Sequence, residues 1–141
     1  MSILQQIQSE LKAPKGQKNN FGNYSYRSAE DILTAVKPLL EKHKVSLVLM
    51  DDIIGVEGRV YVKAAATLQD GDTCLGYSNG FAREALTKKG MDDAQITGSA
   101  SSYARKYALN GLFAIDDTKD PDATNKHDSL PKLTTKQESG F

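Results

Sequence analysis

The sequence predicts an α+β fold, in which a three-stranded antiparallel β-meander is flanked by helices and followed by a disordered acidic tail. Three observations predict this fold. Apolar residues recur at helical spacing before residue 45 and after residue 94, they alternate with other residues between 45 and 84, and large apolar residues are few beyond 115. A sheet of three strands must bury one face under a helix. We therefore expect a β-β-β-α core domain over residues 1–115 and a tail over residues 116–141.

Two helices are expected before the sheet. The first covers residues 2–12 and docks either on its own domain or on a neighbouring subunit. Its apolar positions are Ile3, Leu4, Ile7 and Leu11. The second follows Ser28, a typical N-cap residue, and reaches about His43, with a kink or a break at Pro38 because proline lacks a backbone N–H. Residues 12–27 are predicted to form a loop, since glycine and asparagine recur there.

The three strands are predicted at residues 45–56, 59–69 and 73–85. Gly58 marks the first turn, and the sequence Asp-Gly-Asp at 70–72 is a strong hairpin signal. Glycines alternate with other residues in the third strand, which indicates a close backbone approach or a bend there. The expected sheet is therefore an antiparallel meander with one face available for a covering helix.

The stretch from Ala94 to Phe113, AQITGSASSYARKYALNGLF, predicts that covering helix. We place its start near Ser99, so that mostly small residues share one face, with Tyr103 at its edge. The residues of this face are Ala100, Ala104, Tyr107, Ala108 and Gly111. Because the first N–H groups of a helix have no intrahelical partner, Thr97-Gly98-Ser99 is predicted to bind an anion, for which a phosphate is the obvious ligand. The alternative is a helix whose tyrosines serve packing alone.

Cations and aromatic rings recur together in this chain. Residues 12–27 interleave lysines and an arginine with Phe21 and two tyrosines, which is either a single-strand binding loop or a solvated connector. Residues 83–90 form either a basic lip beside the helix start or a solvated loop. The predicted DNA-binding residues are Tyr24, Tyr26, Arg27, Lys63, Arg83, Lys88, Lys89, Thr97, Ser99, Tyr103, Arg105 and Lys106. Among them we expect Lys88, Lys89, Arg105 and Lys106 to contact phosphates, with Thr97 and Ser99 as hydroxyl or N–H donors.

Composition limits the function classes only weakly. The 18 basic and 18 acidic residues of the chain cancel, but residues 1–112 carry 14 Lys/Arg against 12 Asp/Glu, whereas the rest carry 4 against 6. A single cysteine excludes an intrachain disulfide, no zinc-ligand spacing occurs, and no apolar run is long enough to span a membrane. We expect a protein without cofactors in a reducing cytoplasm, with no membrane partner.

Two segments resemble the signature blocks of the Erf superfamily, phage single-strand annealing proteins of homologous recombination. They are FGNYSYRSAEDILTAVKPLL, from Phe21 to Leu40, and AQITGSASSYARKYALNGLFAIDDTKDPD, from Ala94 to Asp122. The second is more specific, and it contains Tyr103, Arg105, Lys106 and Tyr107. The resemblance implies ATP-independent annealing by ring or helical oligomers with DNA in a basic groove, no enzymatic activity, a fold like that of the eukaryotic annealing rings, and the bacterial host cell as the location.

The expected partners are single-stranded DNA, the annealed duplex and further copies of the chain. An annealing protein should hold the phosphate backbone and leave base edges free for the incoming strand. A host or phage single-strand binding protein or exonuclease is a further candidate partner. Two alternatives stay open: a binding protein that protects DNA without annealing, and a metal-dependent nuclease that uses Asp116, Asp117, Asp120 and Asp122.

Overall fold

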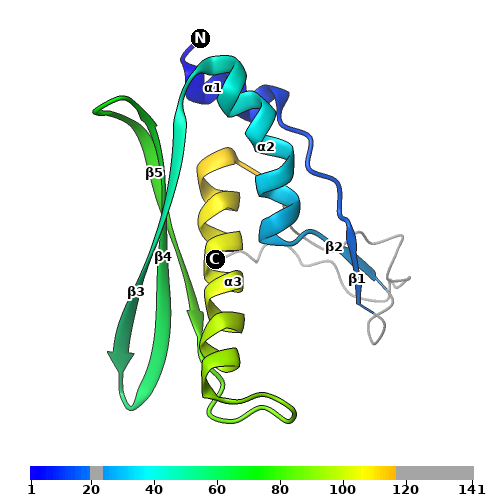
Figure 1. The fold of residues 1–141 in the computed structure, drawn as a ribbon, viewed down its shortest axis with the longest axis vertical. Helices are drawn as coiled ribbons and strands as arrows, with labels where there is room; N and C mark the ends of the chain where they lie inside the picture. The colour runs from blue at the N-terminus through cyan, green and yellow to red at the C-terminus, as the bar shows by residue number, and fades with distance from the viewer. Residues whose placement is uncertain (20–23, 117–141) are drawn as a thin grey trace, which may run out of the picture.

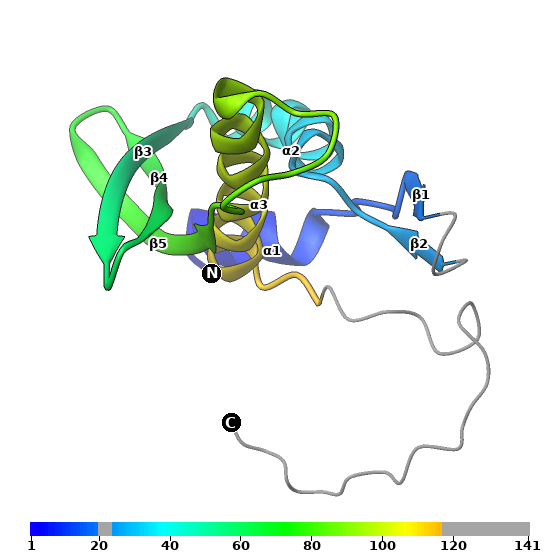
Figure 2. The ribbon, with the colours of Figure 1, turned by 90° about the horizontal axis from the view of Figure 1, so that it is seen from below.

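The computed structural model describes residues 1–19 and 24–116, which form an α+β domain (Figure 1). Its elements are α1 (Ile3–Glu10), β1 (Gln17–Asn19), β2 (Tyr24–Tyr26), α2 (Ala29–His43), β3 (Ser46–Val56), β4 (Arg59–Asp70), β5 (Thr73–Arg83) and α3 (Asp93–Phe113). Helix α3 lies between the sheet of β3, β4 and β5 on one side and α2 on the other, as two perpendicular views agree (Figures 1 and 2). The predicted fold class is confirmed, while the predicted tail after Asp116 and the ring of Phe21 lie outside the described residues.

The main sheet is an antiparallel meander with the strand order β3-β4-β5. Val56 pairs with Arg59 across the first turn, where Glu57 and Gly58 both have positive φ. Gly71, also with positive φ, lies in the second turn, so both hairpins turn where the sequence predicted. A register shift at Leu68 and Gln69 is the one irregularity recorded in the pairing of β4 with β5.

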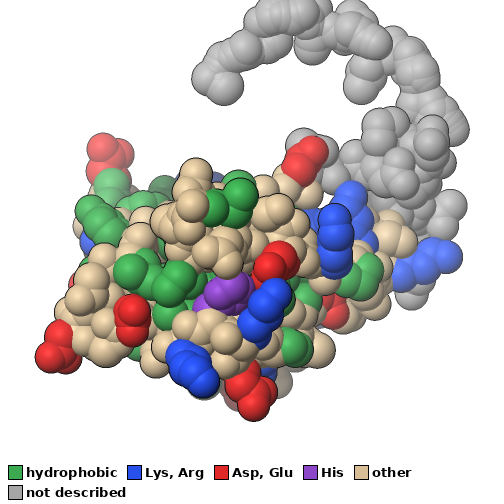
Figure 3. All heavy atoms as spheres, turned by 90° about the horizontal axis from the view of Figure 1, so that it is seen from above, with side chains coloured by type: hydrophobic (Ala, Val, Ile, Leu, Met, Phe, Trp, Pro, Cys, Tyr) green, Lys and Arg blue, Asp and Glu red, His purple; other side chains and the backbone are tan. Residues whose placement is uncertain are grey.

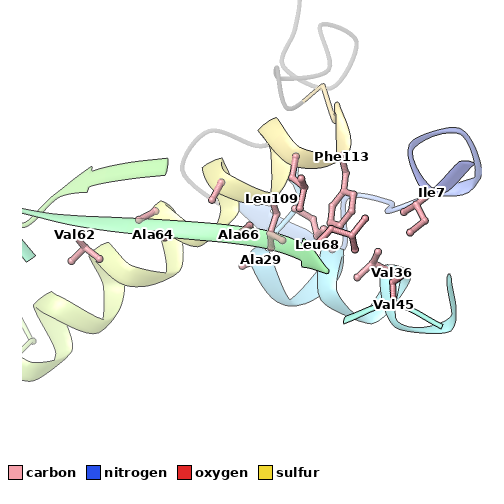
Figure 4. Close-up of a cluster of buried hydrophobic side chains, with 14 of the residues drawn as sticks. Ile7, Ala29, Val36, Val45, Val62, Ala64, Ala66, Leu68, Leu109 and Phe113 are labelled. Atoms are coloured by element: carbon pink, nitrogen blue, oxygen red, sulfur yellow. The ribbon is translucent and has the colours of Figure 1, made fainter. Parts of the chain in front are cut away.

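Small side chains let α3 pack directly on the sheet. The inward-facing residues of β4 are at most 1% exposed and lie beside α3 (Figure 4), and they belong to one hydrophobic core with a stripe of alanines on that helix. These residues are Val62, Ala64, Ala66 and Leu68 on the strand and Ala100, Ala104 and Ala108 on the helix. A Cβ atom on Gly80 of β5 would lie only 2.2 Å from the carbonyl oxygen of Ala104. The close backbone approach that the glycines predicted is therefore present.

Helix α1 packs on its own domain. Ile7 is fully buried, and the Gln8 amide donates a hydrogen bond of 2.8 Å to the carbonyl oxygen of Leu112. The Glu10 carboxylate accepts from Lys42 Nζ at 2.9 Å and lies 3.1 Å from His43 Nε2. Figure 3 shows the histidine side chain with basic and acidic side chains around it, on the face where α1 and α2 lie. Because Ile7 is buried within its own chain, its side chain is not available for a contact with a neighbouring subunit.

The structure differs from three element predictions. Helix α3 starts at Asp93 rather than near Ser99, because Asp92 and Gln95 form a capping box at the helix N-terminus. Helix α2 runs without a break through Pro38, held by its buried face. Residues 12–27 are not wholly a loop, since β1 and β2 pair antiparallel within them. Within the described ranges, no helix combines the length and the apolar content that a bilayer crossing requires.

Candidate nucleic-acid interface

A groove of about 470 Å³ lies between the end of β5, the loop that follows it and the first half of α3. We call it the β5–α3 groove. Three aromatic rings, two cations and a methionine line it: Phe81, Tyr103, Tyr107, Arg83, Lys88 and Met91. Its remaining lining residues are alanines, an isoleucine and Ser99, so none of the lining residues is acidic. The groove therefore combines a positive rim with an unusually aromatic surface.

The rings of the groove are open to solvent. Phe81 is 51% exposed, Tyr103 is 49% exposed and Tyr107 is 47% exposed. The two tyrosines are one helical turn apart on α3, and their ring centroids lie 6.4 Å apart with planes inclined by 30°. Tyr107 was expected on the packing face, but alanines and leucines fill that face and leave its ring half exposed. Exposed aromatic surface gathered in one place is typical of a binding site.

A smaller depression of about 200 Å³, here called the β2–α3 hollow, lies on the other flank of α3. Tyr26, Arg27 and Lys106 line it, together with Ser99 and Tyr103, which also line the β5–α3 groove. The two depressions therefore adjoin at Tyr103. Lys106 is only 9% exposed, and its Nζ lies 5.5 Å from the ring centroid of Tyr26, a cation–π distance.

The structure brings seven of the twelve predicted residues to these two depressions. They are Arg83, Lys88, Ser99 and Tyr103 at the β5–α3 groove, and Tyr26, Arg27 and Lys106, with Ser99 and Tyr103 again, at the β2–α3 hollow. The Arg27 guanidinium also has a structural role, because it donates to the carbonyl oxygens of Ala13 at 2.6 Å and Asp116 at 2.9 Å. It ties the segment after α1 to the end of α3.

Arg105 is engaged elsewhere. Its guanidinium donates to the Asp51 carboxylate of β3 at 3.1 and 3.3 Å, and the Ser101 hydroxyl donates to the same carboxylate. Burial alone would raise the pKa of Asp51, but the hydrogen bonds from Ser101 and Arg105 outweigh it and lower that pKa below its ordinary value. Arg105 thus forms an intramolecular link between α3 and β3, and its contact with a phosphate stays a prediction.

The predicted anion-binding helix start at Thr97-Gly98-Ser99 is also wrong. Because α3 begins at Asp93, the N–H groups of Thr97 and Ser99 lie inside the helix. The Thr97 hydroxyl donates to the Glu84 carboxylate. The true N-terminus of α3 carries Asp92 and Asp93, whose negative charge disfavours a bound phosphate.

Lys89 and Lys63 do not line these two depressions. Lys89 is exposed in the loop before α3, and the backbone of Tyr24 pairs with Asn19. Lys63 is the cross-strand partner of Phe81, but it lines a separate depression on the sheet together with Asp52. No group of three or more potential metal ligands gathers in residues 1–19 and 24–116, and most of the Asp116–Asp122 cluster lies outside them.

Sequence reasoning left Phe81, Met91 and Tyr107 out of the site. The alternation in β5 places Phe81 two residues before Arg83, on the same side of the strand, and this signal could have found it. The spacing of four residues between Tyr103 and Tyr107 could have found the second tyrosine. Met91 follows an irregular loop, and no pattern in the sequence points to it.

Comparison with known proteins agrees with the resemblance to the Erf superfamily that the segments around this site carry. The family model described as the ERF superfamily matches residues 2–139. The chain is 56% identical over 124 residues to the essential recombination function protein of Salmonella phage P22, an alignment that covers 88% of this chain and 58% of that relative. The chain thus spans little more than half the length of this relative. No solved structure matches the chain. The match to the family model over nearly the whole sequence establishes that the chain belongs to the ERF superfamily.

Proposed function

We propose that this chain binds single-stranded DNA and anneals complementary strands without ATP, as a non-enzymatic step of homologous recombination in a phage. The observation that carries the proposal is the β5–α3 groove, whose lining combines cations with aromatic rings and lacks acidic residues. Membership of the ERF superfamily supports it, as does the relative from phage P22, whose name refers to recombination.

Arg83 and Lys88 are the cations best suited to hold phosphates. Both are exposed, and in the described part of the chain neither has an ion-pair partner. Exposed Lys89 adds a third positive charge on the same loop. By contrast, Arg105 already neutralises Asp51. The phosphate contacts that we propose therefore come from Arg83, Lys88 and Lys89.

Oligomerisation is part of the proposal because one subunit carries little net charge. A row of identical subunits repeats the same groove along a strand and adds affinity through avidity. Strands β3 and β5 are the two edges of the sheet, and each can pair with the opposite edge of another copy. Such a head-to-tail contact yields a ring if the rotation closes and a helical filament if it does not.

The test is annealing of two complementary labelled oligonucleotides without ATP, at 50 and 200 mM salt. The proposal predicts acceleration that weakens at the higher salt concentration, because counterions compete with the cations of the groove. Unchanged or slower pairing would contradict annealing, and slower pairing with tight binding would indicate a protein that only protects the strand.

A matched pair of variants locates the effect. Lys88→Ala should weaken binding irrespective of sequence and reduce the slope of log affinity against log salt by about 0.7. Lys37→Ala removes a similarly exposed lysine from α2 and should leave both quantities unchanged. Equal effects of the two substitutions would remove the groove from the proposal.

A further inference from the structure

The β5–α3 groove is more aromatic than phosphate binding requires. Cations alone suffice to track a phosphate backbone, yet three rings, each about half exposed, share the groove with only two cations. Burying an aromatic ring is favourable, so leaving three of them open is costly unless a ligand covers them. The faces of unpaired nucleobases match such rings, because every base presents a π-face.

We propose that the groove holds unpaired nucleobases of the strand, stacked on Tyr103, Tyr107 and Phe81, while Arg83 and Lys88 hold the adjoining phosphates. The inference rests on the proposed binding of single-stranded DNA. It adds contacts with the bases to the proposed contacts with the phosphate backbone of the DNA. Charge complementarity favours a polyanion over an apolar peptide as the occupant, since the two cations face no acidic residue in the lining.

The geometry also provides a way to distinguish single strands from duplex. In a duplex each base is paired and stacked on its neighbours, so its faces are closed to the groove. Binding is therefore selective for the unpaired strand, with a preference that a purely phosphate-binding surface lacks. When a complementary strand pairs with the bound strand, the bases of the bound strand leave the rings and stack within the new duplex. Pairing is thereby coupled to release of the strand from the groove.

The test compares the affinity of the protein for two oligonucleotides of equal length, oligo(dT) and an abasic oligomer that keeps the same phosphates. Base stacking predicts that oligo(dT) binds about tenfold or more tightly than the abasic strand. The double variant Tyr103→Ala/Tyr107→Ala keeps Phe81 as the one stacking ring, so it should lose most of this preference. Tyr77→Ala, which removes a tyrosine that is 70% exposed on β5 and does not line the groove, should keep it.

Each other outcome overturns the inference. Equal affinity of the wild-type protein for the two strands would leave phosphate binding and annealing intact but exclude base stacking. A preference as large in the double variant as in the wild-type protein would place the bases elsewhere. Should the double variant fail to fold, Tyr103→Ala and Tyr107→Ala are measured singly, and each should reduce the preference. An absence of binding to either strand would refute the proposed function as well.

Discussion

Substitution of Gly80 by alanine tests the contact between α3 and the sheet. A Cβ atom at this position would lie 2.2 Å from the carbonyl oxygen of Ala104 and 2.4 Å from the amide nitrogen of Ala108. Both are backbone atoms, so only a shift of α3 away from β5 relieves the clash. Overpacking a core costs about 1–3 kcal/mol, and the backbone clash places Gly80→Ala near about 3 kcal/mol. That loss is a large fraction of the total stability of an ordinary domain.

The assay is urea and thermal unfolding followed by circular dichroism. A loss of about 3 kcal/mol should lower the melting temperature by roughly 10 °C in a domain of this size. Gly55→Ala is the matched control, because a Cβ atom there meets nothing within 4 Å and its φ is not in the left-handed region. We expect that control within about 0.5 kcal/mol of wild type. Equal stability of the two variants would show that α3 does not approach β5 this closely.

Three further predictions concern pH, docking and burial. The lowered pKa of Asp51 stabilises the fold above its ordinary pKa of 3.8, so the stability gap between wild type and Asp51→Asn should close as pH falls through the lowered folded-state pKa; a gap independent of pH would contradict this. Ile7→Ala should cost about 2–5 kcal/mol in urea unfolding, with a loss independent of protein concentration; a loss that depends on protein concentration would contradict docking of α1 on its own domain. Lys106→Met should lower stability to thermal unfolding by about 1 kcal/mol through loss of its contact with Tyr26; weakened DNA binding at unchanged stability would instead support its predicted contact with a phosphate.

The strands were predictable because their signals are local. Gly58 and Gly71 adopt positive φ in the turns where the sequence breaks its alternation, and β4 keeps its alternation throughout. The start of α3 was missed although its signal is local too: Asp92 and Gln95 form a capping box before the apolar pattern begins. Helix propensity is weak near Gly98, and it drew the predicted start toward Ser99.

The site was predictable only in part, because the partners of its residues come from distant segments. Tyr26 covers Lys106 and Asp51 captures Arg105, and neither contact follows from the spacing within the SYARKYAL segment. From residue type alone, a lysine or an arginine on a helix is expected to face solvent. The actual surroundings of Lys106 and Arg105 are set by the strands that pack beside them, β2 and β3. Tyr26, Tyr103 and the basic loop were found because residue type and local sequence context already suggested them.

Photo-crosslinking tests most directly whether the β5–α3 groove holds the strand. An oligonucleotide with 5-iododeoxyuridine at one position is irradiated in complex with the wild-type protein, and the crosslinked peptide is identified by mass spectrometry. We predict crosslinks at Tyr103, Tyr107 or Phe81, which Tyr77→Ala leaves in place. Crosslinks confined to α1, α2 or the exposed face of the sheet would contradict the assignment of this groove as the DNA-binding site.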